Sequence, residues 1–269
     1  MRYLSSDNGA FYHVGTQSDR HSVTAKYVNN LSSTSNITVK ASGSNLDQTI
    51  DTRDYNFRAN QLLYYSELSY FRQFDKMNWV IGANFNGDQF HNRSALIPLN
   101  GYSYNTLGGF VQNTYNPVPA LTIESGLRTD YQNKYGWFVL PRLSVMYKFS
   151  KEWTARVIGG LGYMTPNPLN YIDLEQDLNR LTSVSGLKPE RSHGLNADVN
   201  FQKRIGDVTI NLNQAFFASY INSPVDSLPG TAGVTLYNAP KALRTLGAQT
   251  YMRLTVADWE IYLSYVYTH

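Results

Sequence analysis

The chain has 269 residues, enough for one large all-β domain or two domains of ordinary size. Its 23 lysines and arginines against 20 aspartates and glutamates leave a net charge of +3, and the basic residues are scattered singly among acids, which excludes a nucleic-acid-binding surface. There is no cysteine, which removes disulfides, thiolate metal sites and thiol nucleophiles. The five histidines lie far apart without metal-binding spacing, so we expect neither metal nor cofactor.

A helical membrane protein is also excluded, because mean hydropathy is -0.38 and no apolar run approaches the roughly eighteen residues that a spanning helix needs. A membrane-spanning strand needs only about 9–11 residues, half of which face the lumen, so a barrel stays possible. The 21 tyrosines favour strands and interfacial aromatic girdles, but a soluble carbohydrate-binding β-protein could be equally rich in them.

Alternation of apolar and polar residues predicts strands along most of the chain, since successive side chains of a strand point to opposite faces. The clearest run covers residues 121–163 and forms three consecutive strands. In the third, Leu161 and Tyr163 are expected on the apolar face and Arg156 on the polar face, which carries full charges that a sandwich core would not tolerate unpaired. In chain order, the predicted strands cover 9–28 (one or two strands), 37–41, 62–70, 79–85, 107–115, 121–131, 142–149, 153–163, 195–202, 208–220, 246–254 and 259–267.

Short and long connections alternate between these strands. We expect short turns near residues 33, 75, 118, 151, 206 and 257. Long loops are expected at 42–58, 87–105, 164–188 and 223–241, with a short surface helix at 171–181. The pattern predicts an all-β fold, an antiparallel up-and-down transmembrane β-barrel segment of about twelve strands with short periplasmic turns and long extracellular loops. The alternative is a soluble β-sandwich, whose apolar faces would meet each other in a ligand- or carbohydrate-binding module.

Several short motifs, in order along residues 107–267, resemble the barrel of TonB-dependent outer-membrane receptors. Residues 126–130 (GLRTD) and 141–144 (PRLS) resemble a paired strand signature of that family, and 187–192 (LKPERS) resembles its Leu-x-Pro-Glu-x-Ser run. The chain departs from the family pattern later in that strand, where Asn196 and Asp198 stand in place of Glu and Gly. Further matches are Arg156, Gly160, Gly162, Pro166, Phe216, Phe217, Ile221 and Asn222.

The resemblance implies active uptake of a scarce nutrient across the outer membrane, driven by TonB. The start lacks a signal-peptide core, the end lies inside a strand pattern and no plug-like domain precedes residue 100. We therefore expect residues 1–269 to be a single β-barrel domain, a fragment of a longer receptor without its plug. Its expected partners are the outer-membrane bilayer, TonB through the absent plug, and a small-molecule or glycan ligand, with no nucleic acid. The motifs do not distinguish an iron chelate from cobalamin or a glycan.

Two sets of residues are candidates for function in such a receptor. Arginine and aromatic side chains in the long loops suit chelates, haem or sugars alike. The candidate ligand contacts are His91, Arg93, Tyr102, Tyr104, Tyr171, Arg180 and Tyr237. Charged residues on the polar strand faces are expected to form lumenal ion pairs with each other or with the plug. These are Glu124, Arg128, Asp130, Arg142, Arg156, Asp198 and Arg253.

Catalysis is not expected. Ser192 and His193 are adjacent, but neighbours on a strand point to opposite faces, which is poor geometry for proton transfer. Glu124 and Asp130 could supply paired carboxylates, yet nothing singles them out. The sequence therefore predicts a receptor and not an enzyme.

Overall fold

The computed structural model describes residues 3–7, 10–52, 56–94, 99–167, 181–183, 186–230 and 233–269. These ranges contain strands and turns, and none of their segments is a helix that could span a membrane. The strands are β1 (Tyr3–Asp7), β2 (Ala10–Ser32), β3 (Ser35–Asp51), β4 (Asn56–Gln73), β5 (Met77–Asn92), β6 (Tyr102–Val118), β7 (Leu121–Gln132), β8 (Gly136–Lys148), β9 (Trp153–Met164), β10 (Leu181–Ser183), β11 (Glu190–Ile205), β12 (Val208–Asn222), β13 (Val225–Gly230), β14 (Gly233–Asn238), β15 (Leu243–Val256) and β16 (Trp259–Thr268).

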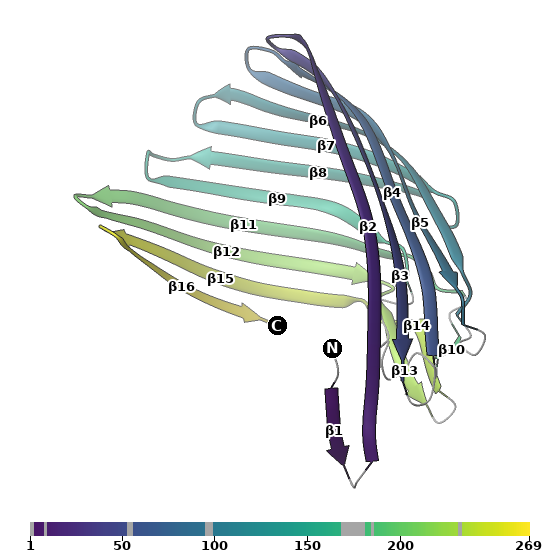
Figure 1. Ribbon diagram of the computed structural model, residues 1–269. Helices are drawn as coiled ribbons and strands as arrows, with labels where there is room; N and C mark the ends of the chain where they lie inside the picture. The colour runs from purple at the N-terminus through teal and green to yellow at the C-terminus, as the bar shows by residue number, and fades with distance from the viewer. Residues whose placement is uncertain are drawn as a thin grey trace.

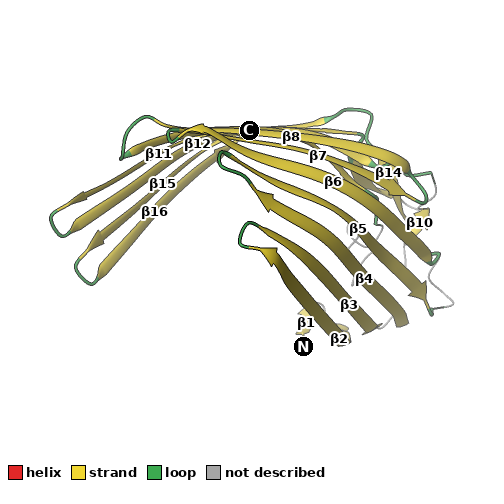
Figure 2. Cartoon of the chain, turned by 90° about the horizontal axis from the view of Figure 1, so that it is seen from above, coloured by secondary structure: helices red, strands yellow, loops and turns green. Residues whose placement is uncertain are grey.

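Thirteen of these strands form one antiparallel sheet in the order β1-β2-β3-β4-β5-β6-β7-β8-β9-β11-β12-β15-β16 (Figure 1). Within this sheet the strands follow one another in chain order, and β10 and the pair β13 and β14 lie in the connections from β9 to β11 and from β12 to β15. Seen from above, the sheet bends into a trough, with β2 and β16 near its two edges (Figure 2). The remaining strands form a small sheet of order β10-β14-β13. The predicted up-and-down barrel segment is confirmed.

The two faces of the large sheet differ as a transmembrane barrel requires. The outward face carries large apolar side chains in register, such as Leu107, which pairs with Phe85 and Tyr131 on the adjacent strands. Leu107 is 59% exposed in the chain alone, and many other large apolar side chains of the outward face are exposed to a similar extent. The lumenal face is polar: at one level, Gly108 lies between Asn84 and Asp130. Outward apolar and lumenal polar residues alternating along every strand are typical of a barrel wall in lipid.

The short turns lie where they were predicted, at the periplasmic end. In the turn between β11 and β12, Gly206 takes a positive φ of 59°, and Ala257 takes one of 48° between β15 and β16. Two-residue hairpins need positive φ because their twist must match that of the strands, and glycine reaches it without steric cost.

The extracellular segments differ from the prediction in part. Strands β3 to β6 continue through most of the regions expected to be loops, at 42–58 and 87–105. They were missed because polar side chains occur on both faces of these extensions, so a few separate apolar residues such as Ile50, Phe57 and Phe90 do not make a regular alternation. The expected loop at 223–241 contains the β13–β14 hairpin. Residues 171–180 of the expected helix lie outside the described residues, and Leu181 begins β10.

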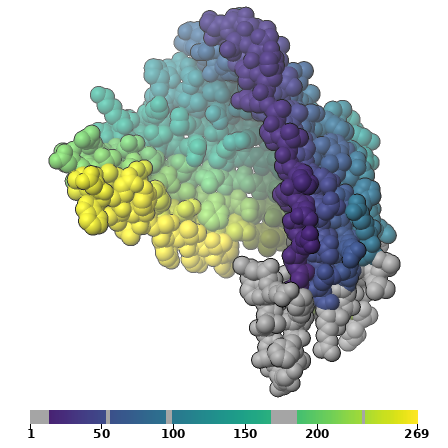
Figure 3. Space-filling view, in the orientation of Figure 1, coloured from purple at the N-terminus to yellow at the C-terminus, as the bar shows by residue number. Residues whose placement is uncertain are grey.

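The main cluster of buried hydrophobic residues lies at the extracellular end of the lumenal face. It joins the ends of β2 to β5 with the small sheet and the segment before β11, through Val14, Ile50, Phe57, Ala59, Phe90, Leu99, Leu187, Val225 and Leu236. The wall within the bilayer needs no such cluster because its apolar side is covered by lipid. The extracellular extensions meet water and must bury apolar surface against one another. The space-filling view shows β2 and the C-terminal strands on the two sides of the hollowed sheet (Figure 3).

Candidate ligand-binding site on the lumenal face

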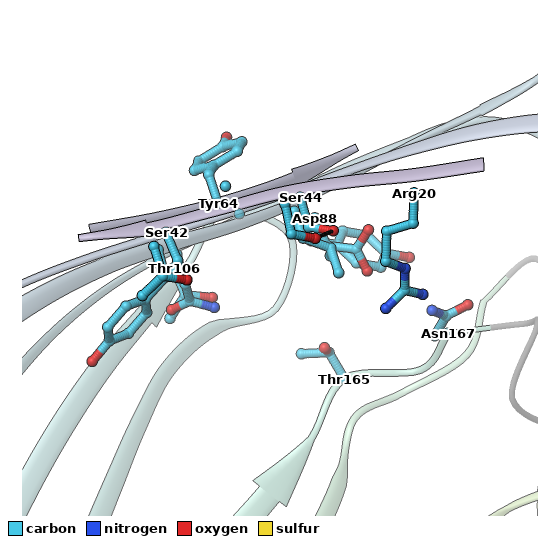
Figure 4. Close-up of a pocket in the computed structure, with 16 residues that line it drawn as sticks. Arg20, Ser42, Ser44, Tyr64, Asp88, Thr106, Thr165 and Asn167 are labelled. Carbon is cyan, nitrogen blue, oxygen red and sulfur yellow. Dashed lines mark hydrogen bonds between the residues drawn. The ribbon is translucent and has the colours of Figure 1, made fainter. Parts of the chain in front are cut away.

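A pocket of about 550 Å³ lies on the lumenal side of β2 to β6, next to the extracellular cluster. Arg20 of β2 and Asn167, which follows β9, point toward one another across it (Figure 4). Tyr64 lies on the other side of the strands. The wall is rich in hydroxyl groups, which come from Ser22, Thr24, Ser42, Ser44, Tyr65, Tyr104, Thr106 and Thr165. The extensions of five adjacent strands thus provide one polar surface.

Asp88 is the carboxylate of this pocket. Its Oδ1 accepts a hydrogen bond from Gln61 Nε2 at 2.9 Å, and its Oδ2 accepts one from the Tyr102 hydroxyl at 3.3 Å. Burial raises the pKa of the Asp88 carboxyl above its usual value, and these two hydrogen bonds offset part of the effect. Burial and the neighbouring carboxylate together raise the pKa of Tyr102, so its hydroxyl remains a donor at neutral pH. Asp88 and Tyr102 lie in strand extensions above the apolar band.

Aromatic rings continue from the pocket toward the extracellular rim. Tyr102 stacks on Phe90 with ring centroids 5.3 Å apart, and on Tyr104 at 4.5 Å. Tyr104 meets Tyr135 at 6.0 Å, and Lys134 Nζ lies 5.3 Å and 5.2 Å from the centroids of those two rings. Stacked rings with a cation over them form a preorganised surface for a flat or partly apolar ligand.

Deeper in the lumen, side-chain contacts of Asp130 join β7 to β9. Its carboxylate is 2.9 Å from Arg128 Nε and accepts a 2.9 Å hydrogen bond from the Tyr163 hydroxyl. Tyr163 was predicted to lie on the apolar outward face with Leu161, and that prediction is wrong. The ring lies instead against Phe138 on the lumenal side, at a centroid distance of 3.7 Å. The reason is that the pairing of β8 with β9 ends at Arg142 and Gly160, which frees the end of β9 from strict alternation.

The structure brings some of the predicted lumenal charges together. Besides Arg128 with Asp130, Arg156 Nη2 lies 3.0 Å from Asp198 Oδ1 on the neighbouring strand, and Arg253 contacts Glu260. Lys40 and Glu67, which were not predicted, pair at 2.8 Å. Within the described residues, Glu124 and Arg142 form no ion pair. Such partly exposed pairs each contribute little to stability, on the order of 0–1 kcal/mol, and mainly organise the wall.

The predicted ligand contacts are dispersed. Tyr104 lines the pocket and Tyr102 binds its carboxylate, although both lie in β6 and not in a loop. His91 is exposed at the end of β5, and Arg93 pairs with Asp47 at 3.4 Å. Tyr237 of β14 donates to Asp226 at 3.4 Å. Tyr171 and Arg180 lie outside the described residues.

Arg20 and Asp88 of the pocket were not predicted. They are far apart in the sequence, and their neighbourhood follows only from the register of β2 with β3 through to β5. The pocket offers the Asp88 carboxylate, the Arg20 guanidinium and many amide and hydroxyl groups, which together can hydrogen-bond a polar ligand.

Among the described residues, no group of three or more His, Asp or Glu side chains could hold a metal ion. Ser192 and His193 lie on opposite faces of β11, with His193 stacked on the outward Tyr220 at 4.7 Å.

An antiparallel wall that is apolar outside and polar inside, with short turns at one end and extended strands at the other, defines a transmembrane β-barrel protein. The family model described as TonB dependent receptor-like, beta-barrel matches residues 2–269. The chain therefore belongs to this family, whose members are receptors and transporters of the outer membrane. The resemblance inferred from the sequence motifs is confirmed.

Solved structures agree on the fold at low sequence identity. The hemophore receptor HasR of Serratia marcescens superposes with a TM-score of 0.79 at 13% identity, over 96% of this chain and 49% of that one. The siderophore receptor PirA of Acinetobacter baumannii superposes with a TM-score of 0.73 at 14% identity, over 94% of this chain and 44% of that one. The FrpB iron transporter of Neisseria meningitidis superposes with a TM-score of 0.74 at 11% identity, over 96% of this chain and 47% of that one. The chain thus spans about half the length of these proteins. No curated protein matches it in sequence.

Proposed function

We propose that the chain forms the ligand-facing wall of an outer-membrane receptor that takes up a scarce nutrient with energy delivered by TonB. The observation that carries this proposal is the polar pocket on the lumenal face, bordered by the stacked tyrosines of β6. A ligand entering from the extracellular side would meet Tyr104 and Asp88 before the charged wall around Asp130. Preformed concave sites with a few placed polar groups are where small ligands bind.

The similar proteins support uptake but leave the cargo open. HasR is a receptor for a hemophore, PirA for a siderophore, and OprC is a copper transporter. Within the proposal, TonB acts through a plug domain that is not part of residues 1–269. The soluble sandwich alternative is disfavoured by the outward face, since side chains such as Leu161 and Phe216 are half exposed or more in the chain alone.

Uptake by cells that carry a receptor containing this barrel tests the proposal. The probes are haemin, a ferric hydroxamate, cyanocobalamin and a maltooligosaccharide, each supplied to cells with and without TonB. We expect saturable uptake of one probe, lost without TonB and reduced at least about tenfold by Tyr104→Ala, since a central aromatic contact typically carries more than 1.4 kcal/mol of binding.

Tyr131→Ala is the matched control because Tyr131 lies on the outward face at a similar height, against Trp137. It should leave uptake unchanged at equal receptor abundance. TonB-independent uptake of every probe, or equal loss with both variants, would contradict the proposal.

A further inference from the structure

The lumenal pocket is built on two neighbouring rows of the sheet, in which the register aligns one residue from each of β2 to β6. The row nearer the extracellular end is Ser22, Ser44, Leu63, Asp88 and Tyr104. We propose that the two rows bind a neutral oligosaccharide. This inference rests on the proposed function, because it names the class of nutrient that the same pocket takes up.

Both rows present hydrogen-bonding groups at almost every position. The second row, two residues nearer the periplasmic end of each strand, is Thr24, Ser42, Tyr65, Asn86 and Thr106. Leu63 is the only member of either row without a hydroxyl, amide or carboxylate group. Neighbouring strands are about 4.8 Å apart, so polar groups repeat at that spacing across five strands. A chain of sugar residues carries hydroxyls along its whole length and can follow such a row, which a compact chelate cannot.

Two hydroxyls of the second row are available to a ligand. Thr24 and Ser42 pair in the register and line the pocket, and within the described residues neither hydroxyl has a hydrogen-bond partner. The Tyr65 hydroxyl of the same row is already used, since it donates to Glu67. A hydroxyl both donates and accepts, as a sugar hydroxyl does, so the two groups can bond to each other in either direction. Thr24 and Ser42 are therefore the residues through which the inference is tested.

The charges at the pocket balance each other. Among its lining residues within the described ranges, only Arg20 and Asp88 are charged. One guanidinium and one carboxylate leave no net charge for the ligand to neutralise. A haem brings two carboxylates and a ferric catecholate several negative charges, so either would place unpaired charge beside Asp88. Sugar hydroxyls can bond to both charged groups without this cost.

An aromatic side chain ends the first row at β6. The Tyr104 ring lines the pocket and stacks on Tyr102 at a centroid distance of 4.5 Å, which fixes its orientation. The C–H groups of a sugar ring form an apolar surface that packs against aromatic side chains, while its hydroxyls project from the edge. Tyr104 and Leu63 thus offer the apolar contacts, and the remaining members of the rows offer the hydrogen bonds.

The pocket also has a second side. Thr165 and Asn167, which follow β9, lie across it from Asp88 (Figure 4). A ligand on the two rows therefore lies between polar groups of β2 to β6 and polar groups at the end of β9. The volume of about 550 Å³ is within the range of about 300–1,000 Å³ that is usual for ligand pockets.

Binding of oligosaccharides to a receptor that contains this barrel tests the inference without transport. The receptor is purified in lauryldimethylamine oxide, a detergent without a sugar headgroup. It is applied to an array of short neutral oligosaccharides from starch, cellulose, xylan, mannan and chitin. Haemin, a ferric hydroxamate and cyanocobalamin are titrated against the same protein by calorimetry. We expect the receptor to bind at least one of the oligosaccharides and none of the other three probes.

The variant T24V/S42A removes the two available hydroxyls and nearly keeps the shape of the side chains. We expect it to bind the retained oligosaccharide at least about fivefold more weakly, because two hydrogen bonds to the ligand are lost. Ser66→Ala is the matched control, since Ser66 is exposed on the outward face of β4 next to Tyr65. It should leave binding unchanged. Far-UV circular dichroism checks folding.

A pair of single variants covers the case in which T24V/S42A does not fold. Thr24 is exposed in the chain alone, so Thr24→Val and Thr24→Ser should both fold. Thr24→Val should weaken binding of the oligosaccharide at least about twofold, whereas Thr24→Ser keeps the hydroxyl and should bind as the unaltered receptor does. Equal binding by Thr24→Val and the unaltered receptor would overturn the inference.

Failure of this inference is distinguishable from failure of the proposed function. The inference is overturned if no oligosaccharide binds, or if a folded T24V/S42A binds as tightly as the unaltered receptor. It is also overturned if haemin, the hydroxamate or cyanocobalamin binds and T24V/S42A weakens that binding. None of these results contradicts TonB-dependent uptake. An oligosaccharide that binds through the two rows but is not taken up by cells with TonB would support the inference and contradict the proposed uptake.

Discussion

Tyr163 of β9 and Asp130 of β7 lie on strands that are not neighbours, yet the tyrosine hydroxyl donates a 2.9 Å hydrogen bond to Asp130 Oδ2. Phe138 of β8 lies between them: it pairs with Asp130 in the ladder and stacks on the Tyr163 ring at an interplanar angle of 4°. The backbone pairing of β8 and β9 ends before this level. Side-chain contacts therefore join β8 and β9 where the ladder does not.

Removing the Tyr163 hydroxyl tests this relationship. Tyr163→Phe keeps the ring on Phe138 but takes one donor from a buried carboxylate, so we expect the free energy of unfolding to fall by about 1.5–3 kcal/mol. Denaturant unfolding in detergent micelles, followed by far-UV circular dichroism, measures the change. Tyr131→Phe, on the outward face, should shift the midpoint very little. Equal shifts in the two variants would show that the hydrogen bond to Asp130 contributes nothing specific.

Gly108 makes room for the polar cluster around Asp130. A Cβ at this position would lie 2.4 Å from Asp130 Oδ1 and 2.6 Å from Asn84 Oδ1, closer than any real contact. Gly108→Ala must displace these buried groups, so we expect a loss of about 1–3 kcal/mol in denaturant unfolding. The next residue offers a sharp control, because a Cβ on the outward Gly109 meets nothing within 4 Å. Gly109→Ala should be neutral, and a loss as large as that of Gly108→Ala would point to strand glycine effects in general.

The raised pKa of Asp88 makes the stability of the extracellular end depend on pH. A carboxyl whose pKa is higher in the folded protein binds its proton more tightly there than in the unfolded chain. The free energy of unfolding should therefore rise as pH falls through the folded pKa, and the gain is complete below the usual value of 3.8. Asp88→Asn should remove this slope. Hydrogen exchange of the β5 and β6 amides between pH 7 and pH 4 measures it, and an unchanged slope in the variant would assign it to other groups.

Much of the wall could be predicted from sequence because lipid imposes a strict rule on it. Between the turns near residues 151 and 206, outward residues such as Val157 and Leu195 must be apolar, so alternation marks each strand. Above the bilayer the rule ends: around Gln48 and Gln89 polar side chains occur on both faces, and the sequence pattern does not distinguish these strands from loops. Tyr163 changes face because pairing stops at Gly160, which is a property of two strands together and not of the sequence of β9.

The candidate site was predictable by residue type and not by position. Tyr102 and Tyr104 stood out as aromatic residues in a long connection, and both lie at the pocket. Arg20 and Asp88 belong to strands three steps apart in the sheet, so only the register brings them to one surface. The pair of Arg128 and Asp130 was easier to predict, because residues two apart on a strand point to the same face.

Phe57 tests the difference between an apolar residue in the extracellular cluster and one that faces lipid. Phe57 is 1% exposed, whereas the outward Phe216 is 57% exposed in the chain alone. Phe57→Ala should open a cavity among residues that water surrounds, costing about 3–5 kcal/mol locally. We expect faster proteolysis and hydrogen exchange at the ends of β3 and β4 and in β13–β14, with the periplasmic half of the wall unchanged. Phe216→Ala loses only lipid contact and should leave those segments protected. Equal protection of them in both variants would mean that the extracellular strands do not depend on this cluster for their order.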